Sequence, residues 1–440
     1  MSRQKLSIEY LSPDDLRPSP RNARTHSKKQ KALIADSIRR FGMVTPIGVG
    51  PDNELVYGHA RVEAARIAGL ETVPVVRLDH LTADERRAYL LADNRLALES
   101  GWDRELLALE LRELEALDFH LPALGFSLPE IDSLYEDLDN SRVDGSDAPD
   151  DGLPGPSDVT VTLDGDIWSM EQHRLLSGDA RGQACYDRLL GDETIDVVFA
   201  DPPYNVKIEN NVSGLGEVRH GDFAMASGEM SPEDFTQFLE QALQPAADRM
   251  RDGGIAFVCM DWRHMAELQT AGLRVFDELK NVCIWNKRNA GMGAFYRSKH
   301  EMIFVFKRGA APHINTFGLG GEGRHRSNVW DYAGVSGISR TGREELAMHP
   351  TVKPVAMIVD ALKDVSARGA IVLDNFGGAG STLIAAEKCG RRARLIEYDN
   401  RYCDTIIRRW QTYTGRMAIH TGSGKTFEEL ESERAKVQFV

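Results

Sequence analysis

An acid, two prolines and an aromatic ring stand together in the segment Asp201-Pro202-Pro203-Tyr204. The apolar run from 195 to 200 precedes it and is short and rich in β-branched and aromatic residues, so we expect a buried strand that ends at the prolines. In open α/β sheets, ligands bind at the carboxyl ends of strands. The segment therefore predicts a site for a flat polar substrate, although a strand-ending turn with a solvated acid has the same pattern.

A glycine-rich segment about 170 residues later is the second candidate site. An apolar run, 370–373, is followed by Asp374-Asn375-Phe376-Gly377-Gly378-Ala379-Gly380-Ser381-Thr382, and a later strand ends in Glu397. Glycines let a backbone approach a ligand closely, and an acid at the end of the next strand can accept both ribose hydroxyls. The spacing is not G-x-G-x-x-G and no Walker lysine follows. These features predict a nucleoside-binding β-α-β unit.

These two segments in one chain resemble the amino-methyltransferase family of DNA methylases. Two further blocks carry the resemblance, one from Trp285 to Glu301 and the other at His349-Pro350-Thr351-Val352-Lys353-Pro354. The catalytic motif precedes the cofactor loop, an order typical of the β group. The resemblance covers about residues 160–430. It implies methyl transfer from S-adenosyl-L-methionine to an exocyclic amine of adenine or cytosine in double-stranded DNA.

The chemistry of that transfer explains the residue types in the first segment. An exocyclic amine conjugated to its ring is a poor nucleophile, so its nitrogen must rehybridise during attack. Asp201 and the carbonyl of Pro202 can accept the two amine hydrogens, with Pro203 helping to fix that carbonyl. Tyr204 can stack on a base flipped out of the duplex. No covalent nucleophile is needed.

The resemblance also implies roles for residues outside this segment. The expected cofactor-binding residues are Asp179, Lys353, Asp374, Phe376, Gly377, Gly378, Gly380, Ser381, Thr382 and Glu397, with Glu397 on the ribose, Asp374 near the methionine amine and Lys353 at the pocket rim. The expected DNA-binding residues are Lys287, Arg288, Tyr296, Arg297, Lys299, Arg324 and Arg326. A solvated basic face remains the alternative for each basic residue in that second group.

The first 120 residues read as a separate small α/β unit. Helical periodicity covers about 27–41, strands follow near 46–57 and 73–76, and further helices are expected at 83–97 and 106–117. The opening Leu16–Arg24 and the box Gly58-His59-Ala60-Arg61 resemble the N-terminal ParB-like (ParB/sulfiredoxin) domain. Nucleotide-binding ParB domains carry two adjacent arginines in this box, whereas Ala60 stands here in place of the first. The box therefore leaves phosphate contact, DNA contact and a plain helix-capping turn open.

An acidic, proline-containing stretch separates this unit from the larger one. Between Glu130 and Asp166 there are twelve acidic residues and one basic residue, Arg142. Such a composition predicts a linker. We therefore expect a ParB-like domain at 1–120, an acidic linker at 121–157 and a methyltransferase domain at 158–432. The fold class is α/β, a Rossmann-like methyltransferase sheet plus the small N-terminal α/β domain.

Composition narrows the class of protein further. The chain of 440 residues has a net charge of −14, so any DNA-binding surface must be local. Its five cysteines are scattered without a C-x-x-C pair, which argues against a disulfide framework and a metal site. No apolar stretch approaches 18 residues and no signal peptide is apparent, so we expect a cytoplasmic protein without membrane partners. A homodimer is left open.

Three functions fit these observations. Site-specific methylation of the N6 amine of adenine is the preferred interpretation, because the Asp-Pro-Pro-Tyr signature favours adenine. The alternatives are N4-cytosine methylation and a ParB-like DNA-binding regulator with a vestigial methylase domain. Such fusions suggest a phage or restriction-modification setting.

Overall fold

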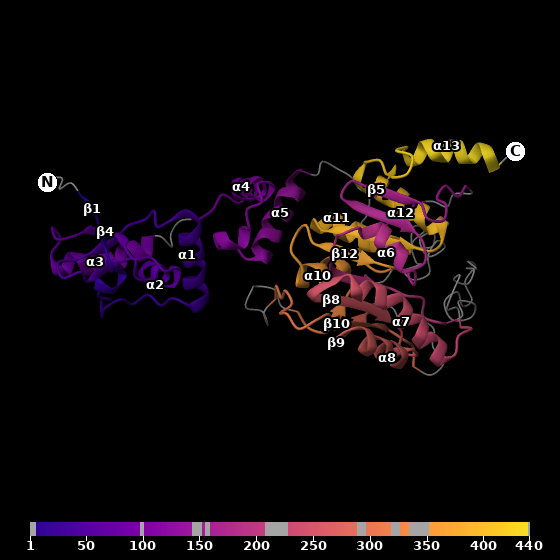
Figure 1. Ribbon diagram of the computed structural model, residues 1–440, viewed down its shortest axis with the longest axis horizontal. Coiled ribbons are helices and arrows are strands. Elements are labelled where there is room, and N and C mark those ends of the chain that lie inside the picture. Colours follow the sequence, from indigo (N-terminus) through magenta and orange to yellow (C-terminus); the bar gives the residue numbers. More distant parts are fainter. Residues whose placement is uncertain are drawn as a thin grey trace. The chain divides into compact units, whose positions relative to one another are not determined.

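The computed structural model describes residues 6–96, 101–142, 152–154, 159–206, 228–287, 296–317, 326–333 and 352–438. The chain divides into two compact units, Met1–Arg142 and Val143–Val440. Each is described by itself, with element labels as in Figure 1. No helix in the described residues is both long and apolar enough to cross a bilayer.

The first unit combines a four-stranded sheet with helices, and its strand order is β1-β4-β2-β3. Buried apolar residues of the strands and of α1 and α2, such as Ile38, Val62 and Val75, form its core. The helices expected from periodicity are present, with ends within two residues of the expected ones. The elements are β1 (Ile8–Leu11), η1 (Pro13–Asp15), α1 (Lys28–Phe41), β2 (Ile47–Val49), β3 (Leu55–Tyr57), α2 (His59–Ala68), β4 (Val73–Arg77), α3 (Ala83–Leu96), α4 (Arg104–Ala116), η2 (Leu121–Leu124) and α5 (Leu128–Arg142).

The linker expected at 121–157 does not begin where composition placed it. Residues 121–142 form η2 and α5, and these pack with α4 around a separate small core. Ile131, Leu134, Tyr135 and Leu138 are buried in that core at spacings of three, four and seven residues, which is one face of a helix. The acidic residues on the other positions of α5 obscured this periodicity.

The second unit is built on one mixed ten-stranded sheet of order β11-β9-β10-β8-β7-β12-β13-β6-β5-β14. Strands β8, β7, β12, β13 and β6 are parallel neighbours, and antiparallel strands flank them. The elements are β5 (Ile167–Met170), β6 (His173–Ser177), α6 (Gln183–Leu190), β7 (Ile195–Ala200), α7 (Pro232–Asp248), β8 (Met250–Met260), α8 (Met265–Val275), β9 (Glu278–Asn286), β10 (His300–Lys307), β11 (Val329–Asp331), α10 (Val355–Val365), β12 (Ile371–Asp374), α11 (Ser381–Cys389), β13 (Arg392–Glu397), α12 (Asn400–Thr414), β14 (Ile419–His420) and α13 (Phe427–Gln438).

Helices cover both faces of this sheet, as Figure 1 shows. Along β7, Val197 and Phe199 point into the layer formed with α10, α11 and α12, whereas Val198 and Ala200 point into the layer formed with α6, α7 and α8. Burial on both faces explains why β7 reads as a continuous apolar run rather than as an alternating one. The α/β, doubly covered sheet expected from the sequence is therefore present.

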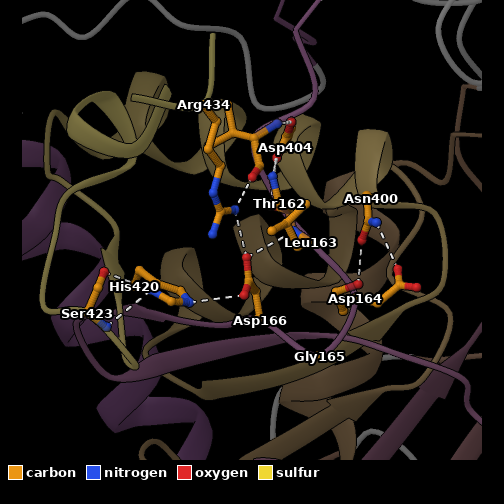
Figure 2. Close-up of polar contacts among 12 residues, drawn as sticks. Thr162, Leu163, Asp164, Gly165, Asp166, Asn400, Asp404, His420, Ser423 and Arg434 are labelled. Atoms are coloured by element: carbon orange, nitrogen blue, oxygen red, sulfur yellow. Dashed lines mark hydrogen bonds and ion pairs between the residues drawn. The ribbon is translucent and has the colours of Figure 1, made fainter. Parts of the chain in front are cut away.

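The outer edge of the sheet beside β5 is closed by a group of polar contacts that we call the edge clasp, formed by Asp166, Asp404, His420 and Arg434 (Figure 2). Asp166 lies between the imidazole of His420, 3.2 Å away, and the guanidinium of Arg434, 2.9 Å away. The buried carboxylate of Asp404 accepts hydrogen bonds from both backbone N–H groups of Val161 and Thr162. The clasp thus joins the segment that precedes β5 to α12, β14 and α13.

We expect Asp404→Ala to destabilise the second unit by about 3 kcal/mol, because it leaves two backbone N–H groups and the Thr162 hydroxyl buried without their acceptor. Chemical denaturation followed by circular dichroism measures the change. Thr405→Ala, at a partly exposed position of the same helix, is the control, and we expect it to stay within about 0.5 kcal/mol of the parent chain. Equal stability of the two variants would contradict this role of Asp404.

Candidate functional site

Four neighbouring parallel strands each end in an acidic residue or have one within two residues of their end, at the same edge of the sheet. In sheet order β7, β12, β13 and β6, these acids are Asp201, Asp374, Glu397 and Asp179. The helix after β7 packs on one face of the sheet and the helix after β12 packs on the other. The crevice between two strands whose connections leave in opposite directions is where open α/β sheets bind ligands. The sheet therefore brings the two segments found in the sequence to one edge.

The turn after β7 is held from both sides. Pro202 is buried, and Asn205 adopts a positive φ of 52° with its side chain buried. The Asn205 amide oxygen accepts hydrogen bonds from the backbone of Gly228 and Met230, and its nitrogen donates to the Met230 carbonyl oxygen at 2.9 Å. Asparagine tolerates this left-handed backbone better than most residues. The turn that carries Tyr204 is thus tied to the chain just before α7.

Asp201 lies in a network of buried charges. Its Oδ2 accepts a hydrogen bond from Lys353 Nζ at 2.6 Å, and its Oδ1 accepts one from the Tyr204 hydroxyl at 2.6 Å. Lys353 Nζ also lies 3.1 Å from Glu301 Oε2, and Lys287 Nζ pairs with Glu301 Oε1. Only 4% of the Lys353 side chain is exposed, so its ammonium must be compensated by these two carboxylates.

The charges in this network shift one another's pKa values. Burial raises the pKa of Asp201, and the Lys353 ammonium opposes that rise without cancelling it. Burial also disfavours ionised Glu301, but the ammonium groups of Lys353 and Lys287 outweigh it and lower the Glu301 pKa to about 2. Lys353 itself has a raised pKa, because the carboxylates overcome its desolvation. Glu301 and Lys353 therefore stay charged at neutral pH.

Lys353 and Glu301 have contacts that the sequence interpretation did not name. Lys353 contacts Asp201 and lies with its nitrogen 5.4 Å from the centre of the Tyr204 ring, while its expected place at the rim of the cofactor pocket stays a prediction. Glu301 was not among the predicted site residues. A signal for it was present, since an acid inside an otherwise apolar strand needs a partner to offset its burial.

The glycine segment after β12 turns tightly against β13 and α12. Gly380 caps α11 with a φ of 77°, which only glycine adopts readily. A Cβ on Gly377 would lie 3.0 Å from the Ile406 side chain. These glycines hold the loop close to the end of β13, where Glu397 stands, and so they serve local packing as well as any ligand.

The two acids of this half brace the same loop. Asp374 accepts hydrogen bonds from the Thr382 hydroxyl at 2.6 Å and from the Phe376 N–H at 3.0 Å. Glu397 accepts 2.8 Å bonds from the N–H groups of Gly378 and Asp399. Burial raises the pKa of Asp374 to about 8 and that of Glu397 to about 7, although these hydrogen bonds oppose the rise. A cationic ligand would relieve this crowding of buried carboxyl groups.

Asp179 and Ser381 lie at the same edge with other partners. Asp179 pairs with the Arg181 guanidinium at 2.7 Å and is about one third exposed. Its neighbour Gly178 donates a backbone hydrogen bond to the Glu397 carbonyl oxygen, which joins the ends of β6 and β13. The Ser381 hydroxyl accepts a bond from Arg409 in the buried start of α11. The expected cofactor residues thus lie on one sheet edge, with Lys353 in contact with Asp201.

The expected DNA-binding residues fall into three groups. Lys287 and Arg326 are engaged inside the unit, Lys287 with Glu301 and Arg326 with Asp364 at 2.9 Å. Tyr296, Arg297 and Lys299 are exposed just before β10, and the Tyr296 side chain is 83% exposed. Arg288 and Arg324 lie outside the described residues.

Comparisons with known protein families divide the chain into three regions. Residues 195–408 match the family model described as DNA methylase. Residues 1–94 match the ParB N-terminal domain, and residues 105–163 match the ParB-methyltransferase HTH domain. The third match includes residues 121–142, the helical segment that composition had led us to interpret as part of a linker.

Relatives agree with this division. The ParB-like nuclease domain-containing protein YnaK of Escherichia coli K12 is 38% identical over 84 residues, which are 19% of this chain and 97% of that protein. The type II methyltransferase M.HinfI of Haemophilus influenzae is 25% identical over 255 residues, which are 53% of this chain and 67% of that enzyme.

Among solved structures, one DNA methyltransferase and one ParB protein are similar to parts of this chain. The PvuII DNA methyltransferase, cytosine-N4-specific, has a TM-score of 0.43 at 12% identity and covers 61% of this chain and 93% of its own. The C-terminally truncated ParB of Caulobacter crescentus, complexed with CTP-γ-S, has a TM-score of 0.26 at 22% identity, with 30% of this chain and 77% of its own covered. Scores at this level say nothing about chemistry.

We expect Lys353→Met to destabilise the second unit by about 3 to 5 kcal/mol at pH 8, because it leaves Asp201 and Glu301 buried without their shared cation. Asp201, whose folded-state pKa is already raised by burial, then loses the cation that opposes the rise, so stability falls as the pH rises through that window. The loss should therefore be smaller at pH 5 than at pH 8, as measured by urea unfolding at both pH values.

Lys388→Met is the matched control, because Lys388 is an exposed lysine on α11. Its effect should stay within about 0.5 kcal/mol at either pH. A Lys353→Met loss that is equal at pH 5 and pH 8 would show that the lysine stabilises the unit by packing rather than by charge.

Proposed function

The chain belongs to the DNA methylases that modify exocyclic amines, with a ParB-like domain ahead of the methylase domain, and we propose that it transfers a methyl group from S-adenosyl-L-methionine to the N6 amine of adenine in double-stranded DNA. One observation carries the proposal: the Asp201 carboxylate and the Tyr204 ring stand at the carboxyl end of β7, directly beside the glycine loop after β12.

The residues after β7 form the base-holding half of the proposed site. Asp201 accepts one amine hydrogen and the Pro202 carbonyl accepts the other, which favours the pyramidal nitrogen and the positive charge that develops on it. The neighbouring proline and the Asn205 tie restrict the motion of that carbonyl. Tyr204 offers a ring face to a base that has left the stack, and such stacking is tolerant of small displacements.

The residues after β12 and β13 form the cofactor-holding half. S-adenosyl-L-methionine, when bound, supplies a methyl group on a positively charged sulfur. Glu397 accepts the ribose hydroxyls, Asp374 faces the methionine amine, and the loop 376–382 lines the remainder. Buried carboxyl groups suit a ligand that carries both a sulfonium and an ammonium charge. Asp179 borders the adenine end from the adjacent strand.

The exposed residues before β10 are the proposed DNA contacts, chiefly Arg297, Lys299 and Tyr296. They continue the β9–β10 hairpin beyond Glu301, and Lys287 donates a backbone hydrogen bond to the Lys299 carbonyl oxygen at the hairpin end. A local basic group of this kind attracts phosphates even on an acidic protein. The ParB-like domain is proposed to guide or regulate the methylase domain.

We expect the purified chain to form N6-methyladenine when it is incubated with labelled S-adenosyl-L-methionine and unmethylated genomic DNA. Asp201→Ala should lower the methylation rate at least about 100-fold, because the acceptor for the amine hydrogen is lost where charge develops. Digestion to nucleosides followed by mass spectrometry separates N6-methyladenine from N4-methylcytosine, and sequencing of modified bases gives the recognition site.

Calorimetric titration of S-adenosyl-L-methionine into Asp201→Ala is the control, and binding should survive because the cofactor-holding half is intact. Exclusive formation of N4-methylcytosine would replace adenine by cytosine as the substrate. Undiminished methylation by the Asp201→Ala variant would overturn the assignment of this site, since Asp201 is the acid placed next to Pro202 and Tyr204 at the end of β7.

We also expect S-adenosyl-L-methionine to bind about tenfold more weakly at pH 6 than at pH 8. Glu397 has a pKa of about 7, and only its ionised form can accept both ribose hydroxyls. Asp374, with a pKa of about 8, acts in the same direction. Glu397→Gln should weaken binding at pH 8 and flatten the pH dependence, as measured by calorimetry.

Glu433→Gln, at an exposed position of α13, is the control and should keep the parent pH dependence. A parent chain that binds the cofactor equally well at pH 6 and pH 8 would remove Glu397 from the proposed ribose contact.

A further inference from the structure

Both carboxylate oxygens of Asp201 are already engaged before any base is present. Oδ2 accepts from Lys353 and Oδ1 accepts from the Tyr204 hydroxyl, each at 2.6 Å. Each carboxylate oxygen still has a lone pair to spare, but the oxygen that faces Tyr204 already accepts a hydrogen bond from it. A base amine must therefore compete with the hydroxyl of the same tyrosine on which the base is proposed to stack.

A second acceptor stands ready for that hydroxyl. The Tyr204 oxygen lies 3.1 Å from Glu301 Oε2, so its proton can turn from Asp201 to Glu301 without displacement of the ring. Lys353 bridges the same two carboxylates, at 2.6 Å from Asp201 and 3.1 Å from Glu301. The two donors, the Tyr204 hydroxyl and the Lys353 ammonium, thus share the two carboxylates as acceptors. The hydroxyl can move from one carboxylate to the other while the ammonium contacts both.

We propose that Glu301 is a positioning residue that takes over the Tyr204 hydroxyl when the target base enters, leaving Asp201 Oδ1 free to accept the amine hydrogen. This inference rests on the proposed function. Before the base enters, the Tyr204 hydroxyl donates to Asp201 Oδ1, and this hydrogen bond holds the tyrosine ring in place. After entry, the hydroxyl is held by Glu301, so the ring keeps its place and no buried polar group loses its partner.

The negative charge of Glu301 has a separate effect on Asp201. It draws part of the Lys353 ammonium away from Asp201, and it raises the Asp201 pKa by direct repulsion. Asp201 is therefore a better hydrogen-bond acceptor with Glu301 ionised than without it. Lys287, which pairs with the far oxygen of Glu301, helps to keep that residue ionised.

The groups that face Asp201 or its neighbour Glu301 come from several neighbouring elements. Their charges set the direction of each shift that a substitution at Glu301 would cause. They are Tyr204 after β7, Cys259 on β8, Lys287 after β9, Glu301 on β10, Lys353 before α10 and Asp374 at the end of β12.

Glu301→Gln tests the inference in the full chain, because glutamine keeps the size and an acceptor oxygen but removes the charge. We expect the rate constant for methyl transfer at saturating DNA and cofactor to fall at least about tenfold, with the cofactor dissociation constant unchanged. The acid limb of the pH profile should move to lower pH, because the Asp201 pKa falls when the repelling charge is removed. Glu301→Asp keeps the charge and should leave that limb near its parent position. Thermal unfolding confirms that both variants fold.

A double-mutant cycle with Tyr204→Phe separates positioning from simple packing. In the Tyr204→Phe background there is no hydroxyl to hand over, so Glu301→Gln should cost at least about threefold less than in the parent chain. Additive effects together with an unmoved acid limb would overturn the inference while leaving the proposed function standing. A parent chain that does not methylate DNA would overturn the proposed function and this inference with it.

Discussion

The parallel pairing of β7 with β12 is the constraint on which the site depends. Val197 and Val198 lie opposite Val372 and Leu373, so two segments about 170 residues apart end side by side. The helices that follow these strands cover opposite faces of the sheet, which is the arrangement in which open α/β sheets bind ligands at the carboxyl ends of the strands. Neither half is complete alone, since the first holds an acid and a ring and the second holds a loop and the acids that brace it.

Electrostatics follows from this placement. Burial raises the pKa of Asp201, Asp374 and Glu397, and neighbouring carboxylates add a smaller rise. Arg181 lowers the pKa of Asp179, and Lys353 and Lys287 lower that of Glu301. Near Asp201, the Lys353 ammonium offsets the negative charge of the buried Asp201 and Glu301 carboxylates. On the glycine-loop side, backbone N–H groups and the Thr382 hydroxyl compensate only in part, which leaves room for a cationic ligand to stabilise the ionised forms.

Much of this could be predicted from the sequence because the responsible signals are local. Apolar runs that end in Asp-Pro-Pro-Tyr or in a glycine loop specify strands and their carboxyl ends, and the sheet edge follows from those. Lys353 and Glu301 could not be placed, because their partners are 152 and 97 residues away and no periodicity links them. The helices at 104–142 were half recognised, since the acidic residues of α5 masked the apolar spacing that buries Leu134 and Leu138.

The helical segment at 104–142 constrains how DNA is held. It matches a domain described as helix-turn-helix, yet it contains ten acidic residues and three basic ones. A surface that binds duplex DNA must neutralise phosphates, and each neutralised phosphate releases a counterion that strengthens binding. The net charge of this segment opposes that term, which within it rests on three basic residues. In the first unit, basic residues gather between Arg17 and Arg40, where eight basic residues stand against one acid. The helices of 104–142 pack around a small core that includes Leu111 and Tyr135.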